Sequence, residues 1–314
     1  MKHYLLNFAA YLTGLILLIF IIIFILSENH EFKPSPKYNY KEFNNAFTNK
    51  DNDLIAIGNS KLLASLDKSI LQNGTNFKSA ILGYSESNIS VSRLTLEAYL
   101  DKCIKKPKIV LFEVSWFSFN SKRTGLKNIT GDLQLKDLSL FKYFFRYGRK
   151  SSNNYFQALK KQILYAELDT SIIFGNHGRR NITNKKNYKF DLLTFNKIFP
   201  THFAGSDNVL KEDFNSIVSL CKKNDIELIL YTAPEDKEYS LAQKDRNVIK
   251  KVFNDLSLLN ETIIYLDYSL GGELYDEKFE YWLADSHHIY NNELFTKKLV
   301  KDIKKARTHN NGYK

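Results

Sequence analysis

A serine, an aspartate and a histidine of the types that hydrolytic enzymes use lie far apart in this chain. Ser60 follows a short apolar run, whereas Asp285 and His288 stand three residues apart near the end. A serine hydroxyl is a weak nucleophile at neutral pH until a base takes its proton, and an imidazole held by a carboxylate suits that task. Taken singly, Ser60 and Asp285 are also residues that commonly cap helices. Their chemistry therefore depends on whether the fold brings them together.

The elements between these residues predict an α/β fold. Apolar runs predict strands over residues 54–57, 79–82, 108–114, 226–231 and 262–266, and helical periodicity predicts helices over residues 61–71, 90–104, 208–223, 241–256 and 291–306. Strands that are apolar throughout and separated by helices are typical of a mostly parallel sheet covered on both faces, which is a three-layer sandwich. In such sheets the ligand site lies beyond the carboxyl ends of the strands.

The residues that directly follow the predicted strands are therefore the candidates for the site. Ser60 would begin a helix, so its backbone N–H is a candidate donor to an oxyanion. Gly83 holds the same kind of position after the second strand, where the lack of a side chain lets another N–H approach the reacting atom. Asn59, Tyr84 and Trp116 follow strand ends as well, and we predict that they contact substrate.

The N-terminal segment predicts a membrane anchor. Residues 5–26 are almost entirely apolar, and about 22 helical residues span the roughly 30 Å of a bilayer core. A cleaved signal peptide is the competing interpretation, but it would have a shorter apolar region and a small-residue cleavage site. Positive charge near Lys2 favours a cytoplasmic N-terminus, which would put the following domain on the periplasmic or extracytoplasmic side. We expect an anchor over residues 1–30 and a stalk over residues 31–51.

The remainder, residues 52–308, predicts a single α/β domain with a helical insertion or cap over about residues 117–201. The net charge of +11 favours anionic partners such as acidic glycans or lipid head groups. No helix-turn-helix, ribonucleoprotein or zinc-finger spacing is present, so we expect no nucleic-acid partner. No cluster has the spacing of a metal or P-loop site, and we expect no cofactor. We expect Cys103 and Cys221 to be buried free thiols, with a disulfide as the alternative in an exported domain.

Two blocks of the sequence resemble those of the SGNH, or GDSL-like, hydrolase superfamily. The segment Ile57-Gly58-Asn59-Ser60 is similar to the first block, with Asn59 where aspartate is usual, and the segment from Asp285 to His288 is similar to the last block, Asp-x-x-His. The resemblance implies a flavodoxin-like fold with Ser60 as nucleophile, His288 as base, Asp285 as the residue that orients it, and Gly83 as an oxyanion donor. His287 is the second choice for the base.

The sequence departs from this pattern at the third block. The third strand ends in Glu-Val-Ser-Trp and lacks the Gly-x-Asn of the family, so Ser115 is a substitute donor or one oxyanion contact is missing. The departure resembles the membrane-anchored branch of the superfamily that acylates cell-envelope polymers, whose usual partner is a membrane-bound O-acyltransferase. The resemblance implies an envelope-facing esterase or acyltransferase acting on glycan hydroxyl groups. The alternatives are a non-catalytic glycan-binding or docking partner and an esterase that acts on lipids.

Overall fold

The computed structural model describes residues 4, 7–8, 10–15, 18, 51–83, 87–120, 191–198, 203, 205–270, 272–275, 289 and 292–311. Contacts within the chain define two units, one of residues 1–36 with 130–173 and one of residues 37–129 with 174–314. The described residues of the first unit are helical and belong to the N-terminal segment. The second unit holds the α/β domain.

Five parallel strands form the sheet of this domain. They are β1 (Leu54–Gly58), β2 (Ser79–Gly83), β3 (Ile109–Glu113), β4 (Glu227–Thr232) and β5 (Ile263–Asp267). The strand order is β2-β1-β3-β4-β5, and every pair is parallel. All five predicted strands are confirmed to within a residue or two. The α/β class with a parallel sheet is confirmed with them.

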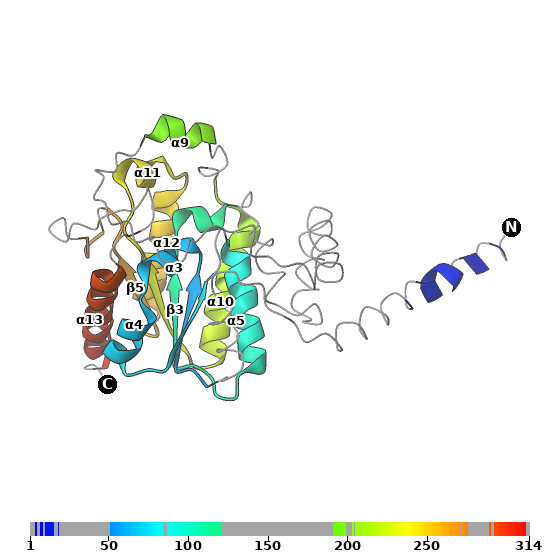
Figure 1. Cartoon of the computed structure of the whole chain (residues 1–314), viewed down its shortest axis with the longest axis horizontal. Helices are drawn as coiled ribbons and strands as arrows, with labels where there is room; N and C mark the ends of the chain where they lie inside the picture. Colours follow the sequence, from blue (N-terminus) through cyan, green and yellow to red (C-terminus); the bar gives the residue numbers. More distant parts are fainter. Residues whose placement is uncertain are drawn as a thin grey trace, which may run out of the picture. The chain divides into compact units, whose positions relative to one another are not determined.

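Helices cover both faces of the sheet. They are α3 (Ser60–Ser65), α4 (Lys68–Thr75), α5 (Ile89–Lys102), the 3-10 helix η1 (Trp116–Phe119), α9 (Leu192–Ile198), α10 (Asn208–Lys223), α11 (Lys237–Ala242), α12 (Arg246–Leu259) and α13 (Asn292–Asn311). Figure 1 shows α4 and α13 on one side of the strands and α5 and α10 on the other. Alternate strand residues face each layer, because successive side chains of a strand point to opposite faces. Leu54 thus belongs to the cluster that includes Phe295 of α13, whereas Phe112 packs against Phe214 of α10.

The helix predicted over residues 61–71 is wrong in one respect, because the chain forms two helices there. Asp67 interrupts the helical run as the N-cap of α4, and its side chain accepts from the backbone N–H of Ile70. The backbone N–H of Asp67 donates to the Thr296 hydroxyl of α13 at 2.8 Å. A side chain that bonds to the backbone competes with helix continuation, and here a distant helix adds a second bond. The helix predicted from residue 241 begins instead at Arg246, after the short α11.

Residues 117–120, which the sequence assigned to the start of the insertion, pack in the core of the domain. Phe119 lies 5.7 Å from Phe214 between ring centroids, and its carbonyl accepts from the backbone N–H of Asp207. Cys221 is buried, and burial raises the pKa of its thiol to about 12. Cys103 is a free thiol as expected, but it is partly exposed rather than buried.

The membrane anchor stays a prediction. Among the residues that the structure describes, no helix has both the length and the apolar character needed to cross a bilayer. Most of the predicted span, residues 5–26, lies outside those residues.

Candidate active site

Ser60 lies at the point where the order of strand addition in the sheet reverses. After β1 the chain forms β2 on one side, and then it returns to form β3 on the other side of β1. This order is the flavodoxin-like one, in which ligands bind beyond the carboxyl ends of the two strands at the switch point. Ser60 is the first residue of α3 after β1, and Ser115 follows β3. The fold therefore places the predicted nucleophile at the position where this class of sheet binds ligands.

The turn that carries Ser60 is fixed by its neighbour Asn59. The Asn59 side chain accepts from the backbone N–H of Lys61 at 2.8 Å and so caps α3. Its amide nitrogen donates to Ser118 Oγ at 2.8 Å and lies 3.4 Å from Ser115 Oγ. Asn59 is 1% exposed, and Ser60 is partly exposed. This geometry gives Asn59 a role in holding the turn, while its predicted contact with substrate remains a prediction.

A glycine is required immediately before this turn. Gly58 has φ +155°, and a Cβ there would lie 3.0 Å from Glu113 Cβ and 3.1 Å from Leu62 Cβ. Residues other than glycine rarely adopt this backbone conformation, so Gly58 combines an unusual φ with a close approach to β3. The glycine lets the Ser60 turn lie directly against the end of β3.

A fully buried lysine follows Ser60. Lys61 Nζ donates to Glu235 Oε2 at 2.8 Å and to the carbonyl of Ala233 at 3.3 Å, and it lies 4.0 Å from Glu113 Oε1. Both glutamates are buried, Glu113 at the end of β3 and Glu235 after β4. Removing a charged side chain from water costs free energy, so buried charges in proteins are paired and hydrogen-bonded. We call Lys61, Glu113 and Glu235 the buried charge cluster.

The pKa of Glu113 is shifted by its burial. Burial raises the pKa of its carboxyl to about 7, although Lys61 and the hydroxyl of Ser115 act in the opposite direction. Glu113 Oε1 accepts from Ser115 Oγ at 2.5 Å, whereas Glu113 Oε2 is buried without a hydrogen-bond partner. Near neutral pH this carboxyl therefore exists in both its protonated and its ionised form.

Trp116 belongs to the same network. Its indole N–H donates to Glu235 Oε1 at 2.6 Å, and its side chain is buried. The guanidinium of Arg246 lies 5.3 Å from the centre of the Trp116 ring. Trp116 therefore connects β3 to the loop after β4, and contact of its ring with substrate remains a prediction.

Ser115 and Gly83 are the two residues predicted to donate to an oxyanion together with Ser60. Ser115 is buried and its only hydroxyl proton points to Glu113, so that hydroxyl cannot donate to a second group at the same time. Gly83 ends β2 beside α3, and a Cβ there would lie 2.9 Å from Leu62 Cδ2 and 3.0 Å from Leu63 Cδ2. Close packing thus gives a structural reason for this glycine, and its role as donor remains a prediction.

The other predicted site residues, Tyr84, Asp285 and His288, together with the alternative base His287, lie outside the described residues. The approach of His288 to Ser60 is therefore a prediction from the order of the elements. The final helix α13 begins at Asn292 and packs against α3, the helix that Ser60 begins.

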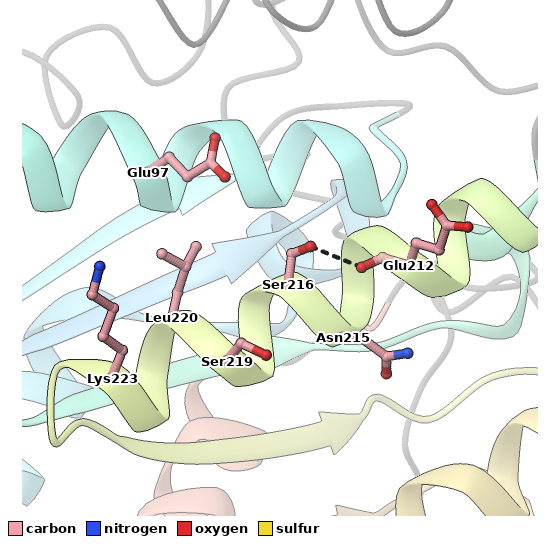
Figure 2. A pocket seen from close by; sticks show the side chains of 7 residues that line it. All are labelled: Glu97, Glu212, Asn215, Ser216, Ser219, Leu220 and Lys223. Atoms are coloured by element: carbon pink, nitrogen blue, oxygen red, sulfur yellow. Dashed lines mark hydrogen bonds between the residues drawn. The ribbon is translucent and has the colours of Figure 1, made fainter.

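The described surface includes one hollow away from the strand ends and one close to them. Figure 2 shows the first, of about 420 Å³, between α5 and α10, with Glu97 on one helix and Glu212 and Lys223 on the other. None of its lining residues follows the carboxyl end of a strand, so it does not belong to the candidate site. The second hollow, of about 620 Å³, is lined by residues that follow β4 and β5, including Lys237 and Arg246. It lies at the carboxyl ends of the strands, as Ser60 does.

Metal ligands are not grouped in this part of the chain. Among the described residues, no three histidine, cysteine, aspartate or glutamate side chains lie close enough together to hold an ion. Glu113 and Glu235 instead share a lysine as their partner.

Comparison with known proteins gives structural matches only. No protein-family model matches the chain, and no curated protein matches it. It is similar to a GDSL-like lipase from Bacteroides thetaiotaomicron, with 12% identity, 85% of this chain and 98% of that chain covered, and a TM-score of 0.45. It is similar to the C-terminal catalytic domain of peptidoglycan O-acetyltransferase A from Streptococcus pneumoniae, with 13% identity, 83% and 95% covered, and a TM-score of 0.40.

A third similar structure is an active-site mutant of a family two carbohydrate esterase from Clostridium thermocellum, with 9% identity, 80% of this chain and 63% of that chain covered, and a TM-score of 0.41. With identities of 9% to 13% and TM-scores of 0.40 to 0.45, these matches say nothing of the activity of this chain.

Proposed function

We propose that this chain is a serine acyl-esterase or O-acyltransferase that acts on hydroxyl groups of a cell-surface glycan or polymer. One observation carries the proposal: Ser60 begins a helix directly after β1, at the switch point of a β2-β1-β3-β4-β5 parallel sheet. That is the position at which such sheets bind their ligands. Among the residues that the structure describes, none forms a hydrogen bond with the Ser60 hydroxyl.

The proposed reaction has two steps that share a covalent intermediate. Ser60 Oγ attacks the carbonyl carbon of an acyl ester while His288 takes its proton, and Asp285 holds the imidazole in the required tautomer. The tetrahedral intermediate expels the alcohol, which takes the proton from His288 and leaves the acyl group on Ser60. Water or a sugar hydroxyl then gives its proton to His288 and attacks the acyl carbon. This second tetrahedral intermediate expels Ser60 Oγ, which takes the proton back from His288, and the acyl group leaves on the acceptor. Water gives hydrolysis, and a sugar hydroxyl gives transfer.

The backbone N–H groups of Ser60 and Gly83 are the proposed donors to the oxyanion. Both residues stand at carboxyl ends of adjacent strands, since Gly58 pairs with Gly83 in the sheet register. Preformed donors at such a position stabilise the charge that develops on the carbonyl oxygen. Ser115, with its hydroxyl committed to Glu113, is not among these donors.

The cationic hollow after β4 and β5 supports an acidic substrate. Among the described residues, neither Lys237 nor Arg246 forms an ion pair, and the lining contains no carboxylate. Arg246 donates to the carbonyl of Leu270 at 3.0 Å, which holds its guanidinium beside the hollow. Unpaired cations at a concave site attract anionic groups. We propose that the hollow receives a carboxylate or phosphate of the glycan chain.

The proposed location follows from the N-terminal segment. Residues 5–26 would hold the domain at the membrane with the N-terminus in the cytoplasm, so that Ser60 faces the cell envelope. A membrane-bound O-acyltransferase is the proposed partner, because it would supply acyl groups on the side where the glycan lies.

Labelling with a fluorophosphonate tests the nucleophile. We expect one adduct on Ser60 of the full chain, loss of the adduct in Ser60→Ala, and loss of acyl-ester turnover in both Ser60→Ala and His288→Ala. Ser216→Ala, in the hollow between α5 and α10, is the control and should retain both. Full turnover in Ser60→Ala would contradict the proposal, provided that all variants unfold at the same urea concentration.

A non-catalytic role in binding glycan or docking onto a membrane enzyme is the second candidate. The observation that favours it is the commitment of the Ser115 hydroxyl to Glu113, which leaves the third-block donor without a replacement. In that case the folded chain would bind an acidic glycan but form no adduct at Ser60.

A further inference from the structure

Glu113 contacts the chain on both sides of Ser60. Before Ser60, Glu113 packs directly against Gly58, where a Cβ would lie 3.0 Å from Glu113 Cβ. Asn59 is linked to Glu113 through Ser115, whose Oγ lies 3.4 Å from the Asn59 amide nitrogen and donates to Glu113 Oε1. After Ser60, Lys61 Nζ lies 4.0 Å from Glu113 Oε1. A single buried glutamate therefore contacts Gly58 and Lys61 directly and is linked to Asn59 through Ser115.

The groups that face Glu113 come from α3, from β4 and the loop after it, and from the residues that follow β1 and β3. Lys61 of α3 favours its ionised form, whereas Glu235 after β4 and burial oppose it. Tyr231 of β4 faces it as well, and the charge of Glu113 helps to raise the pKa of that phenol. Ser115 donates to Glu113 Oε1, and the Asn59 amide nitrogen lies 3.4 Å from the same hydroxyl. These opposing effects leave the carboxyl close to balance between its two forms near neutral pH.

The two forms of Glu113 hold the Ser60 turn differently. An ionised carboxylate attracts Lys61 and strengthens the hydrogen bond from Ser115, because charge-assisted hydrogen bonds are about twice as strong as neutral ones. The Ser115 oxygen also lies 3.4 Å from the Asn59 amide nitrogen, so Asn59 is linked to the same carboxylate. A protonated carboxyl loses the attraction to Lys61 and keeps only neutral hydrogen bonds. The residues before and after Ser60 are thus drawn to the end of β3 more firmly when Glu113 is ionised.

We propose that Glu113 is a positioning residue for Ser60, whose ionisation, transmitted through Asn59 and Lys61, increases the reactivity of the Ser60 hydroxyl. The proposal rests on Ser60 being the nucleophile. It adds a second titration to the site, separate from that of the base His288. Small displacements of a catalytic group lower reaction rates strongly, so a shift of the Ser60 turn is enough to produce the effect.

The test compares the rate of fluorophosphonate labelling of Ser60 in the wild-type chain and in Glu113→Gln as a function of pH. Gln has the shape of Glu but cannot ionise. Both proteins contain His288, so the ratio of their rates cancels the titration of the base. We expect the ratio to be near one at about pH 5.5 and to reach about fivefold or more at about pH 8.5, since only the wild type gains the ionised form. Glu113→Asp, which keeps the charge, should restore part of the rise.

Three other outcomes are informative, and each can be told apart. A ratio that differs from one but is constant with pH would show a merely structural effect and would overturn the inference while leaving Ser60 as nucleophile. A ratio of one at every pH would show that Glu113 does not affect Ser60, and it would also overturn the inference while leaving Ser60 as nucleophile. Absence of labelling in the wild type at every pH would overturn the proposed function itself, and the inference with it. Glu293→Gln, an exposed carboxyl of α13, is the matched control and should keep a ratio of one throughout.

Discussion

Lys61 Nζ lies 2.8 Å from Glu235 Oε2, and both side chains are fully buried although 174 positions separate them in the chain. This pair joins the residue after Ser60 to the loop after β4. Trp116 donates to the other oxygen of the same carboxylate, so a contact from the end of β3 meets the pair as well. The carboxylate of Glu235 thus connects the ends of β1, β3 and β4, at the residue that follows the proposed nucleophile in the chain.

The first prediction concerns the stability that this pair provides. Replacing Lys61 by Met leaves two buried carboxylates without their cation, and we expect a loss of about 3–5 kcal/mol in the free energy of unfolding. Urea unfolding measures it. Lys297→Met removes the cation of an exposed pair with Glu293 and should cost less than about 1 kcal/mol. Equal losses in the two variants would contradict the account of the buried charge cluster.

The second prediction concerns the pH dependence of stability. Burial raises the pKa of Glu113 from 4.5 to about 7, so the folded state binds more protons than the unfolded state between these values. The contribution of Glu113 to stability therefore falls as the pH rises through that window, by about 1.4 kcal/mol per pH unit, and is constant above it.

Glu113→Gln lacks this titration. Its Tm should rise relative to that of the wild type between about pH 4.5 and pH 7 and then stay parallel to it. Thermal unfolding of both proteins across this range is the measurement. A constant difference in Tm at all pH values would show that the pKa of Glu113 is the same in the folded and unfolded states, which contradicts a shift caused by burial.

The third prediction separates the two glycines at the strand ends. Gly58→Ala combines a strained φ of +155° with a contact to the backbone-proximal atom Glu113 Cβ, and we expect it to cost about 3 kcal/mol or more. Gly83→Ala meets only the ends of two leucine side chains and should cost about 1–2 kcal/mol. Urea unfolding gives both values. The reverse order would indicate that the close approach of the Ser60 turn to β3 is not tight.

The fourth prediction concerns the cationic hollow. Lys237→Glu should raise KM for an anionic acyl ester roughly three- to tenfold with little change in kcat, because it reverses a charge that binds substrate without contacting the reacting atoms. The effect should shrink as salt is added. Lys244→Glu, an exposed lysine outside the lining, makes the same change of charge and should leave KM within about twofold. A similar rise in both variants would point to net charge rather than to the hollow.

The sheet could be predicted from the sequence because its strands are short apolar runs that end in glycine or polar residues. The position of Ser60 after β1 could be predicted for the same reason. The division between α3 and α4 could not, since it depends on the contact between Asp67 and Thr296, a residue more than two hundred positions away. Local patterns do not contain such a contact.

The buried charge cluster was missed for a different reason. Lysine and glutamate are almost always on the surface, so Lys61 and Glu235 gave no sign of burial. One signal was available: Glu113 interrupts an otherwise apolar strand, in the segment Lys-Ile-Val-Leu-Phe-Glu-Val. A carboxylate inside such a strand needs a cation nearby. The identity of that cation could not be read from spacing, because it came from a neighbouring strand connection.

The long separation between Lys61 and Glu235 also has a consequence for how the protein is made. During synthesis Lys61 leaves the ribosome well before Glu235 exists, so it stays hydrated and cannot take its final place. Contacts between residues so far apart in sequence form slowly, because the chain must first lose the entropy of closing a long loop. The Ser60 turn is therefore completed only after β4 has joined the sheet. A chain that stops short of β4 lacks Glu235, and Lys61 then has no carboxylate on that side of the site.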